Sequence, residues 1–204
     1  MAFTDNKLSD PAVPGAFLGA GSAHMLSRVH DFIDGPIAQQ DPSMGLDYQQ
    51  WKAYVKDSNV WLTAGNQSPS ILLPSPDNSI TDISIAFSQN ADLHYVWVDS
   101  GVARFRYYDT LAGSMQTMTL PEGTRTPRVT LDDKRPVQSG RSDVILSYLD
   151  AEGRLYFRMQ RDRFGIEYLL DEGPYISLER LYMNEWYRLQ WLLTRRDTIS
   201  VGGN

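Results

Sequence analysis

The chain of 204 residues suits one domain of ordinary size, with or without an extended arm. Its 19 Lys and Arg stand against 25 Asp and Glu, and this formal charge of −6 argues against a general nucleic-acid binder. The absence of cysteine excludes disulfides, thiolate zinc sites and thiol nucleophiles. We expect no membrane span, because no apolar run reaches about 18 residues, and the start lacks the pattern of a secretory signal.

Prolines and glycines divide residues 1–45 into short apolar pieces, and no period of 2 or 3.6 is sustained. We therefore predict an extended arm or loops over 1–45. Within it, residues 22–32 fit one short helix with Ser22 as its N-cap. An arm that cannot bury its own apolar residues often docks on a neighbouring subunit, so we expect the arm to take part in assembly.

Apolar runs alternate with polar turns over residues 46–196, which predicts an antiparallel β domain. Two hairpin units, at about 82–120 and 127–170, repeat one strand–turn–strand pattern. Repeats of this length are typical of propeller-like or sheet-stacking modules. Two or three units are too few to close a ring of blades, so we predict hairpins in a β-sandwich or a partial propeller-like sheet. The polar, glycine-rich residues 197–204 predict a flexible tail.

The last part of the β domain is ambiguous. Over 175–193, large apolar residues fit a helical period fairly well, but a hairpin of strands 175–183 and 187–193 around Asn184-Glu185 fits too, and we favour the hairpin. The other predicted strands are 51–55, 60–62, 83–87, 93–98, 102–108, 144–149, 154–160 and 166–170.

The return strands of the two units carry apolar side chains at alternate positions. Ala103, Phe105 and Tyr107 are predicted to face the core, with Arg106 on the opposite face. Phe105 aligns with Phe157 at a spacing of 52 residues. We expect both phenylalanines to be buried, so that Phe157→Asp unfolds the domain and Arg106→Ser does not.

No pair of carboxylates fits a glycosidase, which needs two of them across a cleft, roughly 5–9.5 Å apart. Asp132 and Asp133 are neighbours on a strand and point to opposite faces. Asp99-Ser100-Gly101 keeps only the spacing of the Asp-box found in sialidase-type propellers, and is better interpreted as a structural turn. The remaining candidates are the carboxylates Asp150 and Glu152, the histidines His24, His30 and His94, and the glycines Gly15, Gly19 and Gly21.

None of these remaining candidates predicts chemistry. The histidines share no metal-ligand spacing, and the glycines lack the residues that complete a phosphate or dinucleotide loop. Eight arginines are suited to an acidic sugar, although pairing with Asp and Glu within or between subunits is the commoner use. We therefore predict no catalytic, cofactor-binding or metal-binding residue, no cofactor and no enzymatic activity. The arginines are Arg104, Arg106, Arg125, Arg128, Arg154, Arg158, Arg161 and Arg163.

Several stretches are similar to one known family. They are RTPRVTLDDKRP (125–136), SDVILSYL (142–149), GRLYFRMQRDRF (153–164), EYLL (167–170), MN (183–184) and RLQW (188–191). Together they resemble tailed-bacteriophage virion proteins over roughly residues 80–193, most specifically in the run RDRF at 161–164. The resemblance implies a β-rich structural protein of the tail or neck, with no catalytic residues.

We therefore predict a non-enzymatic structural protein of a bacteriophage virion, a tail, tail-tip or neck component. Its expected partners are further copies of itself and other tail or neck proteins, with fibres or host-surface glycan as further candidates. It is expected to be assembled in the host cytoplasm, where the lack of cysteine is no disadvantage. The alternative is a carbohydrate-binding or sialidase-like module, which would place Trp or Tyr beside a polar concave face.

Overall fold

The computed structural model describes Ser22–Ala23, His30–Pro36 and residues 48–57, 59–64, 68–74, 79–90, 92–132, 142–183 and 188–195. Strands make up almost all of the regular structure, and they form four antiparallel sheets, which confirms the predicted mainly-β fold class. The predicted tail and most of the predicted arm lie outside the described residues. Among the described residues, no helix is long and apolar enough to cross a membrane.

The sheets follow one another in chain order. The first sheet contains β1 (Ser22–Ala23), β2 (His30–Pro36), β3 (Tyr48–Lys56), β4 (Asn59–Ala64) and β5 (Ser70–Pro74). The second contains β6 (Ile80–Phe87), β7 (Leu93–Asp99), β8 (Val102–Asp109) and β9 (Ser114–Thr119). The third contains β10 (Arg125–Asp132), β11 (Asp143–Leu149), β12 (Leu155–Met159) and β13 (Tyr168–Asp171). The fourth contains only β14 (Tyr175–Met183) and β15 (Leu189–Arg195).

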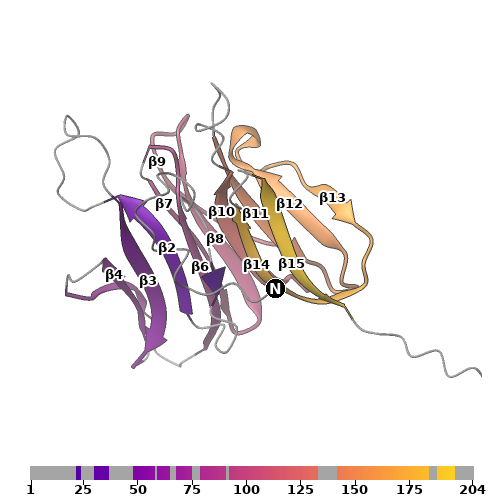
Figure 1. The fold of residues 1–204 in the computed structure, drawn as a ribbon, viewed down its shortest axis with the longest axis horizontal. Coiled ribbons are helices and arrows are strands. Elements are labelled where there is room, and N and C mark those ends of the chain that lie inside the picture. The colour runs from indigo at the N-terminus through magenta and orange to yellow at the C-terminus, as the bar shows by residue number, and fades with distance from the viewer. Residues whose placement is uncertain are drawn as a thin grey trace, which may run out of the picture.

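The four sheets are stacked face to face, with the first sheet at the left and the third at the right of Figure 1. Neighbouring sheets meet along their early strands: β6 packs on β2 and on β10, and β10 packs on β14. Each meander therefore resembles one blade of a partial propeller, and the middle sheets have one face toward the preceding sheet and one toward the following sheet.

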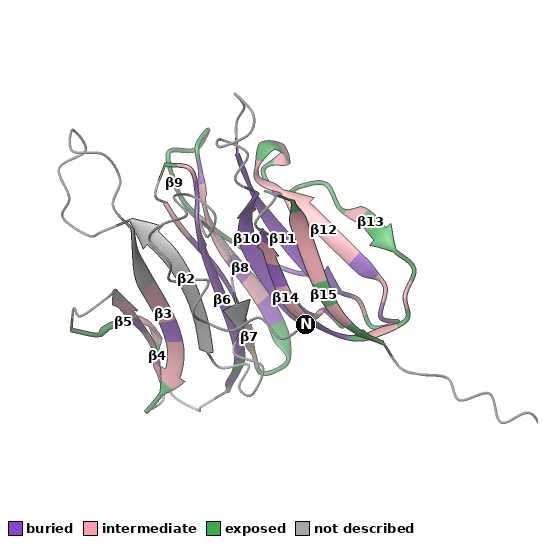
Figure 2. Cartoon of the chain, in the orientation of Figure 1, coloured by how far each residue is buried: buried purple, intermediate pink, exposed green. Residues whose placement is uncertain are grey.

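Buried residues, coloured purple in Figure 2, are concentrated on the strands in the middle of the stack. The predicted core face of β8 is confirmed, because Ala103 and Phe105 are buried and Tyr107 packs against the same cluster. Ala53, Val60, Leu62, Ile83, Ile85, Phe87, Tyr95 and Trp97 form the core between the first and second sheets. Ala86, Val96, Ala103, Phe105, Val129, Leu131, Val144, Leu146, Tyr148 and Phe164 form the core between the second and third sheets.

The prediction that Phe157 is buried like Phe105 is wrong. Phe105 is fully buried, whereas Phe157 is half-buried and stacks on Tyr168, with ring centroids 5.1 Å apart. The cause is the narrow fourth sheet, whose β14 packs on β10 and β11. Leu155 at the start of β12 is buried against Leu178 of the fourth sheet. Phe157, two residues further along β12, is only partly covered.

Local sequence patterns misplaced several other elements. The predicted helix over 22–32 is wrong at both ends, because Ser22–Ala23 pair with residues of β2, and β2 pairs with β3 along its length; residues 24–29 lie outside the described part. Here sheet pairing overrides the local pattern. The hairpin predicted over 175–193 is confirmed by β14 and β15. The strands β5, β9 and β10 were not among the predicted strands, and β13 starts at Tyr168 instead of residue 166.

Candidate functional site

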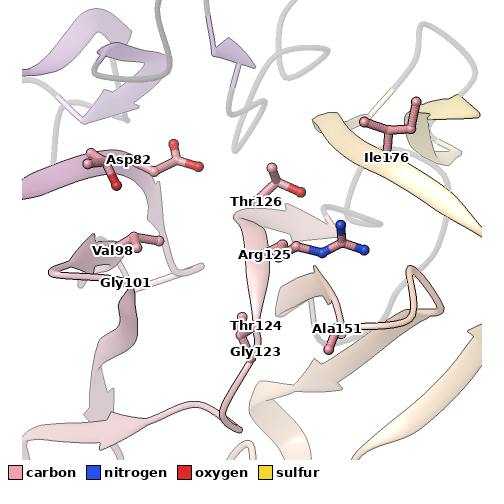
Figure 3. A pocket seen from close by; sticks show the side chains of 10 residues that line it. Asp82, Val98, Gly101, Gly123, Thr124, Arg125, Thr126, Ala151 and Ile176 are labelled. Carbon is pink, nitrogen blue, oxygen red and sulfur yellow. The ribbon is translucent and has the colours of Figure 1, made fainter.

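A pocket of about 600 Å³ lies where the second, third and fourth sheets meet (Figure 3). Its walls come from the starts of β6, β10 and β14 and from turns of the second and third sheets. The lining residues are Thr81, Asp82, Val98, Gly101, Gly123, Thr124, Arg125, Thr126, Ala151 and Ile176. The lining includes no Trp and no Tyr, which is not what a glycan-binding face requires.

The acidic group of the pocket, Asp82, is neutralised by a buried arginine. Arg128 is 1% exposed, and its Nη1 donates to both carboxylate oxygens of Asp82 at 2.9 Å. The same guanidinium donates from Nε to the Glu179 carbonyl at 3.3 Å, so one side chain of β10 binds β6 and β14 together. Asp82 is therefore committed to an ion pair and is not placed as a general base.

A β-bulge at the start of β10 lies between the two arginines of this strand. Thr126 has a φ of 45°, and the pairing of β10 with β11 shifts register between Arg125 and Arg128. A β-branched residue rarely adopts this backbone conformation. The Thr126 hydroxyl accepts a hydrogen bond from the Leu178 N–H at 2.9 Å, which ties the bulge to β14.

Arg125, the cation of the pocket, is held by backbone carbonyls. Its Nε donates to the Asp150 carbonyl at 3.0 Å and its Nη2 to the Tyr175 carbonyl at 3.5 Å. Arg125 thus joins β10 to the β11–β12 turn and to β14. The Asp82 carboxylate is neutralised and the Arg125 guanidinium is bound to carbonyls, so the two do not form an acid–base pair. Their contacts hold neighbouring sheets together.

Pairing with carboxylates is confirmed for six of the eight arginines, as an ion pair in each case. Such a set leaves few guanidinium groups for an acidic sugar. The pairs are Arg104–Asp99, Arg128–Asp82, Arg154–Asp150, Arg158–Glu167, Arg161–Asp143 and Arg163–Asp109.

The carboxylate candidates also have structural roles. Asp150 and Glu152 share Arg154 as their cation, and the Asp150 carboxylate accepts the backbone N–H of Arg154 at 2.9 Å. Asp99 closes its turn by accepting from the Ser79 and Ser100 hydroxyls. Asp132 is buried, and Asp133 lies outside the described residues. Within the described part of the chain, no group of His, Asp or Glu is arranged to hold a metal ion.

Two ion-pair networks were not predicted from the sequence. Tyr148 donates its hydroxyl to Glu167, while Arg158 donates to both, and burial together with the Glu167 hydrogen bond raises the pKa of Tyr148. In the second network, Arg163 reaches from the third sheet to Asp109 of the second sheet at 2.5 Å, and this hydrogen bond lowers the pKa of Asp109. Both networks link residues that lie far apart in the sequence. The one local indication was that Asp109 begins a turn, in which its carboxylate accepts backbone N–H groups.

Of the three histidines, His94 has a described side chain, and it is fully buried between the rings of Phe105 and Phe164. Its Nδ1 lies 2.9 Å from the Asp92 carbonyl, and Nε2 has no hydrogen-bond partner. Burial lowers the pKa of His94 to about 4. The imidazole is therefore a neutral core residue.

We expect this burial to make the fold acid-sensitive. Below about pH 6.5 the unfolded chain takes up a proton at His94, while the folded chain does so only near pH 4. Folding stability from this group is thus complete above pH 6.5 and falls by up to about 3 kcal/mol as the pH drops to 4. Urea unfolding of the wild type and of His94→Leu across pH 4–7 measures the difference. Parallel pH profiles for the two proteins would contradict the assignment.

Comparison of the chain with protein-family models, with curated protein sequences and with solved structures found no match.

Proposed function

We propose that the protein is a non-enzymatic structural subunit of a tailed-bacteriophage virion, in the tail or neck, that forms oligomers and joins other virion proteins. The family resemblance of residues 80–193 supports the choice of virion. The structural observation that carries the proposal is that the outer strand of each sheet has exposed apolar side chains.

Every sheet ends in an outer strand that carries at least one exposed apolar side chain. Ile71 of β5 is 55% exposed, Met115 of β9 36% and Leu192 of β15 42%. Leu169 and Leu170 are both exposed on β13, seen in green in Figure 2. Exposed apolar edges favour unwanted pairing unless a partner covers them, so proteins that function alone usually protect them. Their presence on all four sheets favours a subunit of an assembly.

The ion pairs between sheets agree with a structural role. Arg128, which is buried, and Arg163, whose side chain is more exposed, each bind a carboxylate of another sheet. These contacts stabilise the relative positions of the sheets. A protein whose function is to be bound requires such rigidity more than it requires a reactive cleft.

The mass of the purified chain in solution tests this proposal. Light scattering over a range of concentrations is expected to give a multiple of the 23.1 kDa chain mass. Replacing Leu169 by Lys should lower that mass if the β13 edge takes part. A glycan array is the second measurement. A stable monomer that binds a defined glycan would contradict the proposal and favour the carbohydrate-binding alternative.

A further inference from the structure

A turn after β12 inserts one large side chain into the core between the second and third sheets. The Phe164 ring is fully buried and meets Phe105 edge-on, with ring centroids 4.7 Å apart. The residues on either side of it, Arg163 and Gly165, are exposed. We call residues 163–165 the latch. Phe164 thus enters the core from a surface turn, whereas Phe105 belongs to a strand that is paired on both sides.

The backbone of the latch has an unusual conformation. Arg163 has a φ of 52° and Phe164 a φ of 57°, in the left-handed region that residues with a side chain rarely adopt. Such a conformation persists only where the surrounding contacts enforce it, and it is common in segments that switch between two states. Release of the latch would relieve the strain at both residues.

One ion pair and one ring attach the latch to the second sheet. The Arg163 guanidinium binds the Asp109 carboxylate, although the Arg163 side chain is 55% exposed. Other hydrogen bonds of the latch stay within the third sheet. The Phe164 N–H donates to the Met159 carbonyl at 3.0 Å, and Arg158 donates to the Phe164 carbonyl at 2.9 Å. The latch takes no part in the pairing of β12, so it can leave the second sheet while the strands stay paired.

The latch packs on a histidine whose ring is incompletely hydrogen-bonded. Phe164 contacts the fully buried His94, with ring centroids 6.2 Å apart. Nδ1 of His94 lies 2.9 Å from the Asp92 carbonyl, and Nε2 has no hydrogen-bond partner among the described residues. A buried polar atom in this condition costs free energy, which contact with water would recover. Withdrawal of Phe164 would give the imidazole that contact.

We infer that the latch opens as a unit while the strands stay paired, and that proton uptake by His94 holds it open. In the closed state, burial lowers the pKa of His94 to about 4. In contact with water the pKa of the imidazole returns toward its ordinary 6.5. The open state therefore binds the proton more tightly, and opening becomes more favourable as the pH falls from 6.5 toward 4. The acid response then begins at three residues, before the whole fold unfolds.

Ionisable groups of the second sheet do not oppose this response. Asp92 acts to raise the pKa of His94, but the effect of burial is larger. The Arg163 hydrogen bond lowers the pKa of Asp109 below its usual 3.8, so this carboxylate stays ionised between pH 4.5 and 6.5. The ring of Tyr107 packs on Phe164, with centroids 4.9 Å apart.

On the opposite side, the third sheet contributes Tyr148 to the same core cluster. Burial and the hydrogen bond to Glu167 raise the pKa of Tyr148, so its hydroxyl keeps its proton in this range. Arg158 binds both Tyr148 and Glu167. On β6 the residue paired with His94 is Ala86, which carries no charge.

Hydrogen exchange of the full chain between pH 4.5 and 6.5, followed by mass spectrometry, tests the inference. The amides of residues 163–165 report on the latch, and those of Ile145–Leu149 in β11 report on global unfolding. After correction for the intrinsic exchange rate, the latch is expected to exchange through an opening that leaves β11 protected. Its opening constant should rise about 40-fold from pH 6.5 to 4.5, as uptake of one proton by His94 requires.

Two variants separate the roles of the proton and the ion pair. His94→Leu should remove the pH dependence of the opening constant. Arg163→Gln weakens the bond to Asp109, so it should raise the opening constant about threefold and keep the pH dependence. Arg104→Gln is the matched control, because Arg104 pairs with Asp99 outside the latch and its loss should leave latch exchange unchanged.

Three results would overturn the inference. The first is equal protection of the latch and β11 at every pH, and the second is a wild-type opening constant that does not change with pH. The third is the same pH dependence in His94→Leu as in the wild type. Circular dichroism establishes that each variant is folded, and if His94→Leu does not fold, the wild-type profile decides through the first two results.

Discussion

Replacing Arg128 by Met is expected to lower the free energy of unfolding by about 3–5 kcal/mol. The substitution leaves the Asp82 carboxylate buried without its cation and removes the bond to the Glu179 carbonyl. Urea unfolding at neutral pH measures the loss. The double variant Arg128→Met with Asp82→Leu should recover a large part of it, because no buried charge then remains unpaired.

Arg104 supplies the matched control for Arg128. Its pair with Asp99 has the same chemistry and a distance of 3.2 Å, but the two side chains are 35% and 33% exposed. Arg104→Met should therefore cost less than about 1 kcal/mol. Equal losses for the two variants would mean that burial does not set the strength of these ion pairs, and the assignment of Arg128 as the link between sheets would fail.

Replacing Phe105 by Ala should cost about 3–5 kcal/mol, because the ring is fully buried against Phe164 and Tyr107. Phe157→Ala should cost about 1–2 kcal/mol in the isolated subunit, since only part of that ring is removed from water. Thermal and urea unfolding of the two variants provide the comparison. A loss at Phe157 as large as that at Phe105 would contradict the difference in burial between the two rings.

Local patterns predicted the strands well where polar turns separate apolar runs. Alternation of side chains placed Ala103, Phe105 and Tyr107 on the core face of β8, because a strand in a stack has two distinct faces. The same alternation could not predict the different burial of Phe157. That burial depends on the width of the next sheet, which no residue near Phe157 encodes.

The pocket and its arginines were beyond sequence reasoning for a related reason. Arg125 and Arg128 were recognised as members of an arginine set, and carboxylate pairing was expected, but their separate roles were not. Asp82 lies 46 positions from Arg128, so no spacing rule connects them. The bulge at Thr126 also escaped prediction, because a β-branched residue with positive φ is contrary to local preference.

Arg128 of the third sheet bonds to both the second and the fourth sheet, and we expect these bonds to make the three sheets unfold together. In a solenoid, each repeat contacts only its neighbours, so the terminal repeats can fray independently. Here the fourth sheet cannot separate without breaking the Arg128 bond to the Glu179 carbonyl and admitting water to the ion pair with Asp82. Amide hydrogens of β14 should therefore exchange in the same global event as those of β6 and β10, in spite of the terminal position of β14 in the stack.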